Sequence, residues 1–224
     1  MPLDLARIQA ICFDVDGTLS DTDDRWVERL AAVLRPLRLP QHMRLARWLI
    51  MGIESPANGL YEILDRLHLD DEAARLVDWL FRQQNKRSGH FTLIEGVDEM
   101  LMRLKERYPL AVVSARGEKA TLSFLEQFNL RGHFRAIATA LTCVHTKPLP
   151  HPVIWAAEQM GVSPANCLMV GDTVVDIRAG KAAGAQTVGV LCGFGREREL
   201  RRAGADLILE NTAQLSAVLR QVHP

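Results

Sequence analysis

Short hydrophobic runs alternate with helical patterns along most of the chain. The runs lack polar alternation, which is typical of strands covered on both faces. They lie at 8–13, 110–114, 136–140, 167–170, 187–191 and 207–209. Apolar residues at helical spacing predict helices at 97–107, 118–128, 151–160 and 173–184. This alternation predicts an α/β fold with a parallel sheet and helices on both faces.

One long segment, from about residue 20 to residue 92, breaks this rhythm because it shows no strand signal. Its apolar residues recur at helical spacing in four stretches. We therefore predict an α/β core formed by 1–19 and 93–224, with a small all-helical cap over 20–92 inserted after the first strand. Within the cap, the Gly- and Pro-containing turn at 50–59 is a candidate specificity loop.

Charge and cysteine content narrow the class of protein. The 224 residues include 27 acidic and 27 basic side chains. Such a balance argues against a nucleic-acid partner, because phosphate backbones favour net positive charge. The N-terminus does not resemble a signal peptide, and no apolar run approaches the ~20 residues of a membrane span. The four cysteines form no C-x-x-C pair. We expect a soluble, cytoplasmic monomer or homodimer without membrane or nucleic-acid partners.

Polar side chains follow several of the predicted strands. They are Asp14, Asp16 and Thr18 after the first strand, Ser114 and Arg116 after the second, Lys147 after the third, and Asp172 and Asp176 after the fourth. Ligands of parallel sheets bind beyond the carboxyl ends of the strands. We therefore expect these side chains to converge on one site.

This set of groups suits a phosphate ester and Mg²⁺. Magnesium prefers oxygen ligands, which Asp14, Asp172 and a backbone carbonyl can supply together with substrate phosphate oxygens. A carboxylate can attack phosphorus to form an aspartyl-phosphate. A second carboxylate two residues further on can act first as general acid and then as base. Lys147 and the hydroxyls of Thr18 and Ser114 can hold the phosphoryl oxygens.

Two other binding motifs fail on inspection. An EF-hand loop starting at Asp14 requires Asp or Asn, Gly and Glu where the chain has Thr18, Leu19 and Arg25. The sequence GFGRER has an arginine in place of the third glycine of a dinucleotide-binding loop.

Some acidic and aromatic residues have structural interpretations instead. We interpret three acidic residues, Asp21, Asp23 and Asp24, as a solvated loop and the N-cap of the following helix. Three tryptophans at helical spacing, Trp26, Trp48 and Trp79, are interpreted as core residues of the cap.

The sequences DVDGT and GDTVVD, with Ser114 and Lys147 between them, resemble the four motifs of the haloacid dehalogenase superfamily. The resemblance covers essentially the whole chain and implies a Rossmann-like core with a helical cap. It implies that Asp14 is the nucleophile. Asp16 would be the acid/base and would offer its backbone carbonyl to Mg²⁺, while Asp172 would complete the protein ligands.

The same resemblance implies roles for the remaining groups. Thr18, Ser114 and Lys147 would bind phosphate, and Asp176 would support the water shell of the metal or orient Lys147. The branch that contains phosphoglycolate phosphatase and β-phosphoglucomutase is the most similar. Where phosphoglycolate phosphatases often have Asn and Lys after the second motif, this chain has Ala and Arg116. Arg116 is therefore a candidate contact for an anionic part of the substrate.

These features predict a magnesium-dependent phosphatase of small phosphorylated metabolites that acts through an aspartyl-phosphate. A sugar phosphomutase is the alternative enzyme. A signalling receiver module uses similar groups, but the helical insert and the position of DVDGT on the first strand count against it. A non-catalytic binding protein on the same scaffold is a further alternative, and the complete set of catalytic groups disfavours it.

Overall fold

The computed structural model describes residues 3–21 and 91–220. The predicted cap helices, the candidate specificity loop at 50–59, Asp23, Asp24 and the three cap tryptophans lie outside the described residues. The described residues belong to one unit, which joins Met1–Thr22 to Phe91–Pro224. In that part of the chain, no helix has the length and apolar character needed to cross a bilayer.

Six parallel strands form one sheet in the order β5-β4-β1-β6-β7-β8. They are β1 (Ala10–Phe13), β4 (Leu110–Val113), β5 (Ala136–Ala138), β6 (Cys167–Gly171), β7 (Gln186–Val190) and β8 (Leu207–Leu209). Each coincides with one of the predicted runs. The prediction of a parallel α/β sheet is confirmed.

Helices of two types, α and 3₁₀, lie between or beside these strands. The α-helices are α5 (Val97–Leu104), α6 (Glu118–Gln127), α7 (His151–Met160), α8 (Val174–Ala182), α9 (Glu197–Ala203) and α10 (Leu215–Leu219). Single 3₁₀ turns are η1 (Leu5–Arg7), η3 (Arg131–His133), η4 (Pro164–Asn166) and η5 (Thr212–Gln214). The four predicted helices correspond to α5 to α8. The sequence predicted neither α10 nor α9, whose residues ERELRRA are mostly charged and bury only Leu200.

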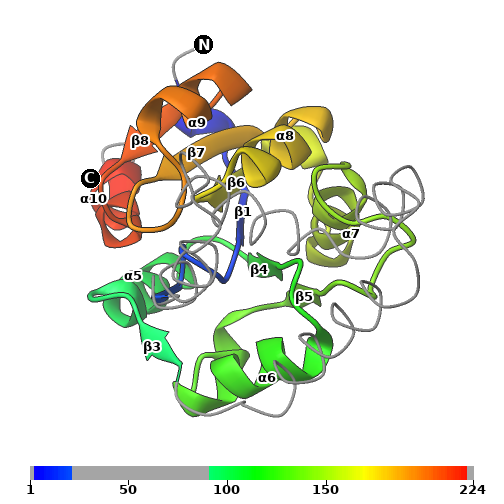
Figure 1. The fold of residues 1–224 in the computed structure, drawn as a ribbon, viewed down its shortest axis with the longest axis vertical. Coiled ribbons are helices and arrows are strands. Elements are labelled where there is room, and N and C mark those ends of the chain that lie inside the picture. The colour runs from blue at the N-terminus through cyan, green and yellow to red at the C-terminus, as the bar shows by residue number, and fades with distance from the viewer. Residues whose placement is uncertain (1–2, 22–90, 221–224) are drawn as a thin grey trace, which may run out of the picture. The chain divides into compact units, whose positions relative to one another are not determined.

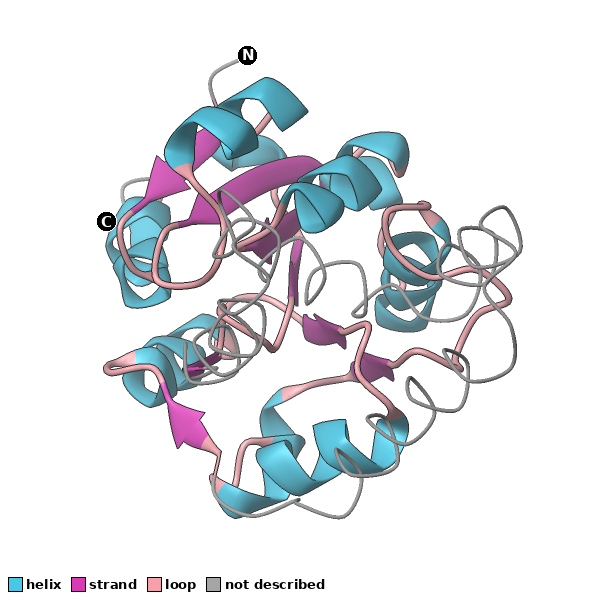
Figure 2. Cartoon of the chain, in the orientation of Figure 1, coloured by secondary structure: helices cyan, strands magenta, loops and turns pink. Residues whose placement is uncertain are grey.

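Both faces of the sheet are covered, because successive residues of a strand point to opposite sides. Ile11 and Phe13 of β1 pack into a core that includes apolar residues of α5, α6 and α10. Ala10 and Cys12 pack into a second core with residues of α7 and α8. Figures 1 and 2 show these helices on the two sides of the sheet. The small side chains of the second core allow close packing of α7 and α8.

Two short strands were not predicted. β2 (Ser20–Asp21) and β3 (Thr92–Leu93) pair in antiparallel fashion, and the Ser20 hydroxyl donates to the Thr92 carbonyl at 3.3 Å. Asp21 is therefore an exposed strand residue rather than part of a loop, which corrects the expectation for this position. A ladder of two residues is too short to produce a periodic pattern, and its partners are distant in sequence.

The position of β1 in the sheet determines where a ligand can bind. β1 lies between β4 and β6, and the chain moves away from β1 toward both edges of the sheet. Such a reversal of strand order creates a crevice at the carboxyl ends of the central strands. DVDGT follows β1 at this edge, and GDTVVD follows β6 next to it.

Candidate active site

Three buried carboxylates meet at the carboxyl ends of β1 and β6. They belong to Asp14, directly after β1, to Asp172, directly after β6, and to Asp176 in the first turn of α8. One oxygen from each lies within 4.8 Å of the others. The backbone N–H of Asp14 donates to the Val170 carbonyl at 2.9 Å, which fixes the two strand ends relative to each other.

Lys147 enters this cluster from the loop between β5 and α7. Its Nζ atom donates to Asp14 Oδ1 at 2.7 Å and to Asp176 Oδ1 at 2.6 Å. The lysine is almost fully buried, so its charge is shared by these two carboxylates rather than screened by water. A lysine that would be ordinary on the surface is therefore part of the site.

Asp176 is held by its own helix terminus. Its Oδ2 accepts hydrogen bonds from the backbone N–H of Thr173 at 3.0 Å and from the Thr173 hydroxyl at 2.6 Å. The Thr173 hydroxyl in turn accepts from the Asp176 backbone N–H, which completes a capping box at the start of α8. With Oδ2 bound in this way, Oδ1 is presented to Lys147. This contact favours the predicted role of Asp176 in orienting Lys147, and both predicted roles of Asp176 stay predictions.

The charges in the cluster do not balance, because one ammonium faces three carboxylates. Burial, opposed by Lys147 and reinforced by the neighbouring carboxylates, raises the pKa of Asp14 to about 7. Burial and the charges of Asp176 and Asp14 also raise the pKa of Asp172 well above its usual value. Burial alone would disfavour the ammonium form of Lys147, but Asp14 and Asp176 outweigh it and raise the pKa of Lys147.

This imbalance fits a divalent cation. Burial and the neighbouring carboxylates raise both carboxyl pKa values, and a cation beside the carboxylates would lower them. The donors are hard oxygens, which suit Mg²⁺. Both oxygens of Asp176 accept short hydrogen bonds, at 2.6–3.0 Å, whereas Asp172 Oδ1 has the longer contact with the Thr18 hydroxyl, at 3.4 Å.

The predicted hydroxyl groups lie around the same cluster but have different partners. The Thr18 hydroxyl is buried and donates to Asp172 Oδ1 at 3.4 Å. Ser114 Oγ, at the end of β4, accepts from the backbone N–H of Arg116 at 3.1 Å. Thr18 thus has a contact with a carboxylate that the sequence prediction did not include, and the binding of phosphate by both residues stays a prediction.

Arg116 lies beside the second carboxylate of DVDGT. Its Nη2 atom donates to Asp16 Oδ1 in a partly buried ion pair. The guanidinium carbon lies 5.0 Å from the centre of the Phe91 ring, so the arginine also makes a cation–π contact. Within the described residues, Nη1 of Arg116 is buried and has no hydrogen-bond partner. The side chain therefore has a donor available next to Asp16.

Two contacts of the site were not predicted from sequence. Phe91 supports Arg116, and the backbone N–H of Phe194 donates to Asp172 Oδ2 at 2.7 Å. Phe194 lies in the GFGRER stretch, so this segment does bind an anion, although the anion is a side chain of the protein rather than a dinucleotide.

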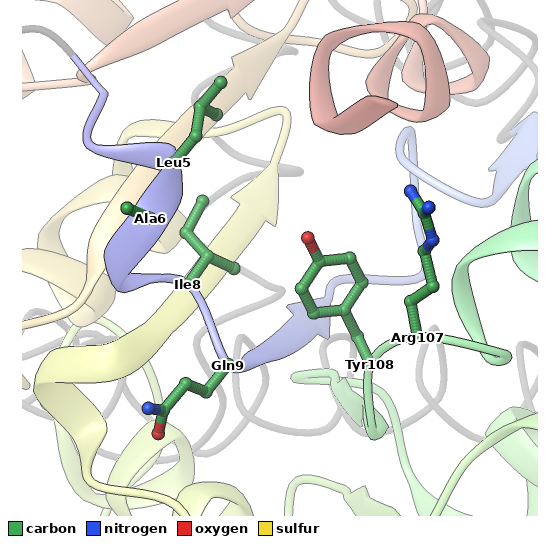
Figure 3. A pocket seen from close by; sticks show the side chains of 6 residues that line it. All are labelled: Leu5, Ala6, Ile8, Gln9, Arg107 and Tyr108. Carbon is green, nitrogen blue, oxygen red and sulfur yellow. The ribbon is translucent and has the colours of Figure 1, made fainter. Parts of the chain in front are cut away.

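Figure 3 shows a pocket in a different part of the described residues. Leu5, Ile8 and Gln9 line it on one side, and Arg107 and Tyr108 line it on the other. These residues precede β1 and β4, so the pocket lies at the amino ends of the strands. It contains none of the carboxylates, and we do not assign the chemistry to it.

Comparison with known proteins agrees with the site. The chain matches the family of haloacid dehalogenase-like hydrolases over residues 11–190, and it belongs to this family. It is 28% identical to a phosphoglycolate phosphatase of Chromobacterium violaceum, over 97% of this chain and 99% of the relative. It is 29% identical to an N-acetylmuramic acid 6-phosphate phosphatase of Pseudomonas putida, over 95% and 96% of the two chains.

A solved structure shows the same fold. The crystal structure of a hydrolase from Pseudomonas syringae is similar to this chain with a TM-score of 0.74 at 25% identity. The similarity covers 96% of this chain and 100% of that one. The resemblance to the superfamily inferred from the four motifs is confirmed.

Proposed function

We propose that the chain is a magnesium-dependent phosphatase of small phosphorylated metabolites that acts through an aspartyl-phosphate on Asp14. The observation that carries this proposal is the buried cluster in which Lys147 bridges Asp14 and Asp176 beside Asp172. The phosphatases to which the chain is similar over nearly its whole length support the same reaction class. The four free cysteines agree with a reducing compartment such as the cytoplasm.

A residue is proposed for each step of the reaction. A carboxylate oxygen of Asp14 forms a bond to phosphorus while the bond from phosphorus to the ester oxygen breaks. Asp16 gives a proton to the departing oxygen and later takes a proton from the water that attacks the aspartyl-phosphate. The attack of water releases inorganic phosphate and restores the Asp14 carboxylate. Lys147 keeps Asp14 oriented throughout, because it is anchored on Asp176.

Mg²⁺ would be held by the side chains of Asp14 and Asp172 and by the backbone carbonyl of Asp16. It would supply positive charge that offsets the repulsion between the nucleophilic carboxylate and the phosphate. Ser114 and Thr18 are proposed phosphate ligands together with Lys147. The contact of Thr18 with Asp172 adds a second role for its hydroxyl, in the orientation of a metal ligand.

Arg116 is proposed to contact an anionic part of the substrate. Its buried, unpartnered Nη1 is a donor that a substrate oxygen can satisfy, which favours binding because an unpaired buried donor is costly. An Arg116→Ala enzyme should therefore have a KM raised by about 10-fold for phosphate esters that carry a second anionic group. An unchanged KM and unchanged substrate preference would remove Arg116 from the substrate site.

The function is tested by a phosphate-release screen over phosphosugars, phosphoglycolate, nucleotides and pyrophosphate, with and without Mg²⁺. We expect release from at least one ester, with Mg²⁺ only. No release from any ester in the presence of Mg²⁺ would contradict the proposal. Slow release combined with bisphosphate-dependent isomerisation of a sugar phosphate would instead identify a phosphomutase.

A further inference from the structure

The segment Cys192–Gly195, which follows β7, forms a wall of the carboxylate cluster. The Phe194 backbone N–H donates to Asp172 Oδ2 at 2.7 Å, and both groups are buried. The Cys192 thiol lies 3.5 Å from the Gly17 carbonyl oxygen and 3.3 Å from the Thr212 hydroxyl. The Thr212 hydroxyl in turn donates to the Thr18 carbonyl at 2.7 Å. The segment is thus attached to the loop after β1 as well as to Asp172.

Glycine is required in this segment for space rather than for backbone conformation. A Cβ atom added at Gly193 would overlap Asp172 Oδ2, and one added at Gly195 would overlap the Asp172 carbonyl oxygen. Neither glycine has a positive φ. In the loop after β1, a Cβ at Gly17 would also overlap Asp172 Oδ2, and Gly17 adjoins Gly193. The backbones of two loops therefore approach Asp172 too closely to leave room for a Cβ atom.

The contacts divide the two oxygens of the Asp172 carboxylate. Oδ2 accepts from the Phe194 N–H and lies close to Gly193 and Gly17, and Oδ1 accepts from the Thr18 hydroxyl. Separate partners for the two oxygens restrict the rotation of the carboxylate. Groups that orient a metal ligand in this manner typically change metal affinity by 10–100-fold when they are altered.

We propose that Gly193–Gly195 is a positioning element that fixes Asp172 for metal binding and so sets the affinity of the protein for Mg²⁺. The inference rests on the proposed function only in taking Asp172 as a ligand of the metal. None of the three residues is assigned a part in the chemistry, and the hydrogen bond from the Phe194 N–H joins the segment to Asp172.

The main test is Gly193→Ala, which adds one methyl group that would overlap Asp172 Oδ2 and also the Gly17 carbonyl oxygen. We expect the Kd for Mg²⁺, measured by calorimetry without substrate, to rise at least about 10-fold. The lost activity should return at high Mg²⁺, with KM for the ester nearly unchanged. The matched control is Gly132→Ala, because a Cβ at Gly132 meets nothing within 4 Å and the residue has no positive φ. A folded Gly193→Ala protein with wild-type Mg²⁺ affinity would overturn the proposal.

A second measurement uses the wild-type protein, so it does not depend on the folding of a variant. In an amide NMR titration with Mg²⁺, the Phe194 signal should shift along the same binding curve that calorimetry gives, while the Gly132 signal stays in place. Saturation with Mg²⁺ without a shift at Phe194 would overturn the proposal.

The two tests separate this inference from the proposed function. Mg²⁺ binding that weakens in Gly193→Ala, in a protein that releases phosphate from no ester, would support the positioning role and contradict the phosphatase. Phosphatase activity together with the same Mg²⁺ affinity in wild type and Gly193→Ala would support the phosphatase and contradict the positioning role.

Discussion

Two ionic clusters at different places on the same sheet, one partly exposed and one buried, show how a structural ion pair differs from a reactive one. Lys181 of α8 donates to both oxygens of Asp206 at 2.6 Å, and the backbone N–H and hydroxyl of Thr187 complete the shell of the carboxylate. Although burial opposes ionisation, these hydrogen bonds lower the pKa of Asp206. At the carboxyl ends of β1 and β6, one lysine serves three carboxylates, and the pKa of Asp14 rises to about 7.

The difference lies in how completely the charge is compensated. Asp206 has a full set of donors, so its ionised form stabilises the fold and nothing remains for a ligand. Asp14 and Asp172 are buried beside a third carboxylate with one lysine between them, so their repulsion favours the uptake of a proton or the binding of a cation. A reactive site can therefore be recognised by an electrostatic deficit, which the number of acidic residues alone does not reveal.

The largest expected effect comes from the nucleophile. Asp14→Asn keeps the size of the side chain but removes the attacking oxygen, so turnover should fall by at least about 10⁴-fold. The matched control is Asp206→Asn, which makes the same chemical change in the compensated cluster and should leave kcat within about 2-fold. Steady-state phosphate release measures both. Turnover that survives in Asp14→Asn would show that another group attacks phosphorus.

Removal of divalent metal should have the next largest effect. Dialysis against a chelator should reduce turnover by about 10²–10³-fold, because the cation offsets charge at the reacting phosphate. Added Mg²⁺ should restore activity and also raise the melting temperature of the wild-type protein. In Asp172→Asn the thermal shift should be much smaller. Full activity in the chelated enzyme would contradict the metal assignment.

Loss of Lys147 should affect both rate and stability. Lys147→Met leaves Asp14 and Asp176 buried without their shared cation, so the free energy of unfolding should fall by about 3 kcal/mol. Denaturant titration with and without Mg²⁺ measures this loss, and Mg²⁺ should recover part of it. If Lys147→Met were as stable as wild type without metal, the cluster would not have the charge deficit described above.

The smallest effect is expected at the compensated cluster. Asp206→Asn should lower the free energy of unfolding by about 2 kcal/mol, because it weakens charge-assisted hydrogen bonds to a partly exposed lysine. Since the folded pKa of Asp206 lies below the ordinary 3.8, this stabilisation is fully present above pH 3.8 and is lost as the pH falls through the folded pKa. The difference between the two proteins in urea titrations should thus be constant from pH 5 to pH 8. A difference that grew with pH over this interval would refute the assignment.

The sheet could be predicted from sequence because its strands are buried on both faces and read as uninterrupted apolar runs. For the same reason, the polar residues that end those runs mark one edge, and Asp14, Lys147 and Asp172 are found together there. The helix α9 could not be predicted, because it packs on the sheet through one apolar side chain, Leu200, which lies against Gly189.

The contacts that orient the site were beyond sequence reasoning for a different reason. Phe194 binds Asp172 through its backbone N–H, which every residue except proline has, so no side chain marks the position. The need for glycine at position 193 arises only when two strand ends meet in the fold. Phe91 lies against Arg116, but it adjoins a segment with apolar residues at helical spacing. No sequence feature therefore linked Phe91 to the strand ends that carry the site.

Trapping the intermediate would test whether Asp14 is the nucleophile of this buried cluster. An ester that the screen identifies is prepared with a radiolabelled phosphoryl group, mixed with enzyme and Mg²⁺, and quenched in acid within one turnover. Peptide mapping should then place the label on Asp14, in amounts that rise and decay at the rate of phosphate release. Full release of phosphate without label on the Asp14 peptide at any quench time would contradict the account.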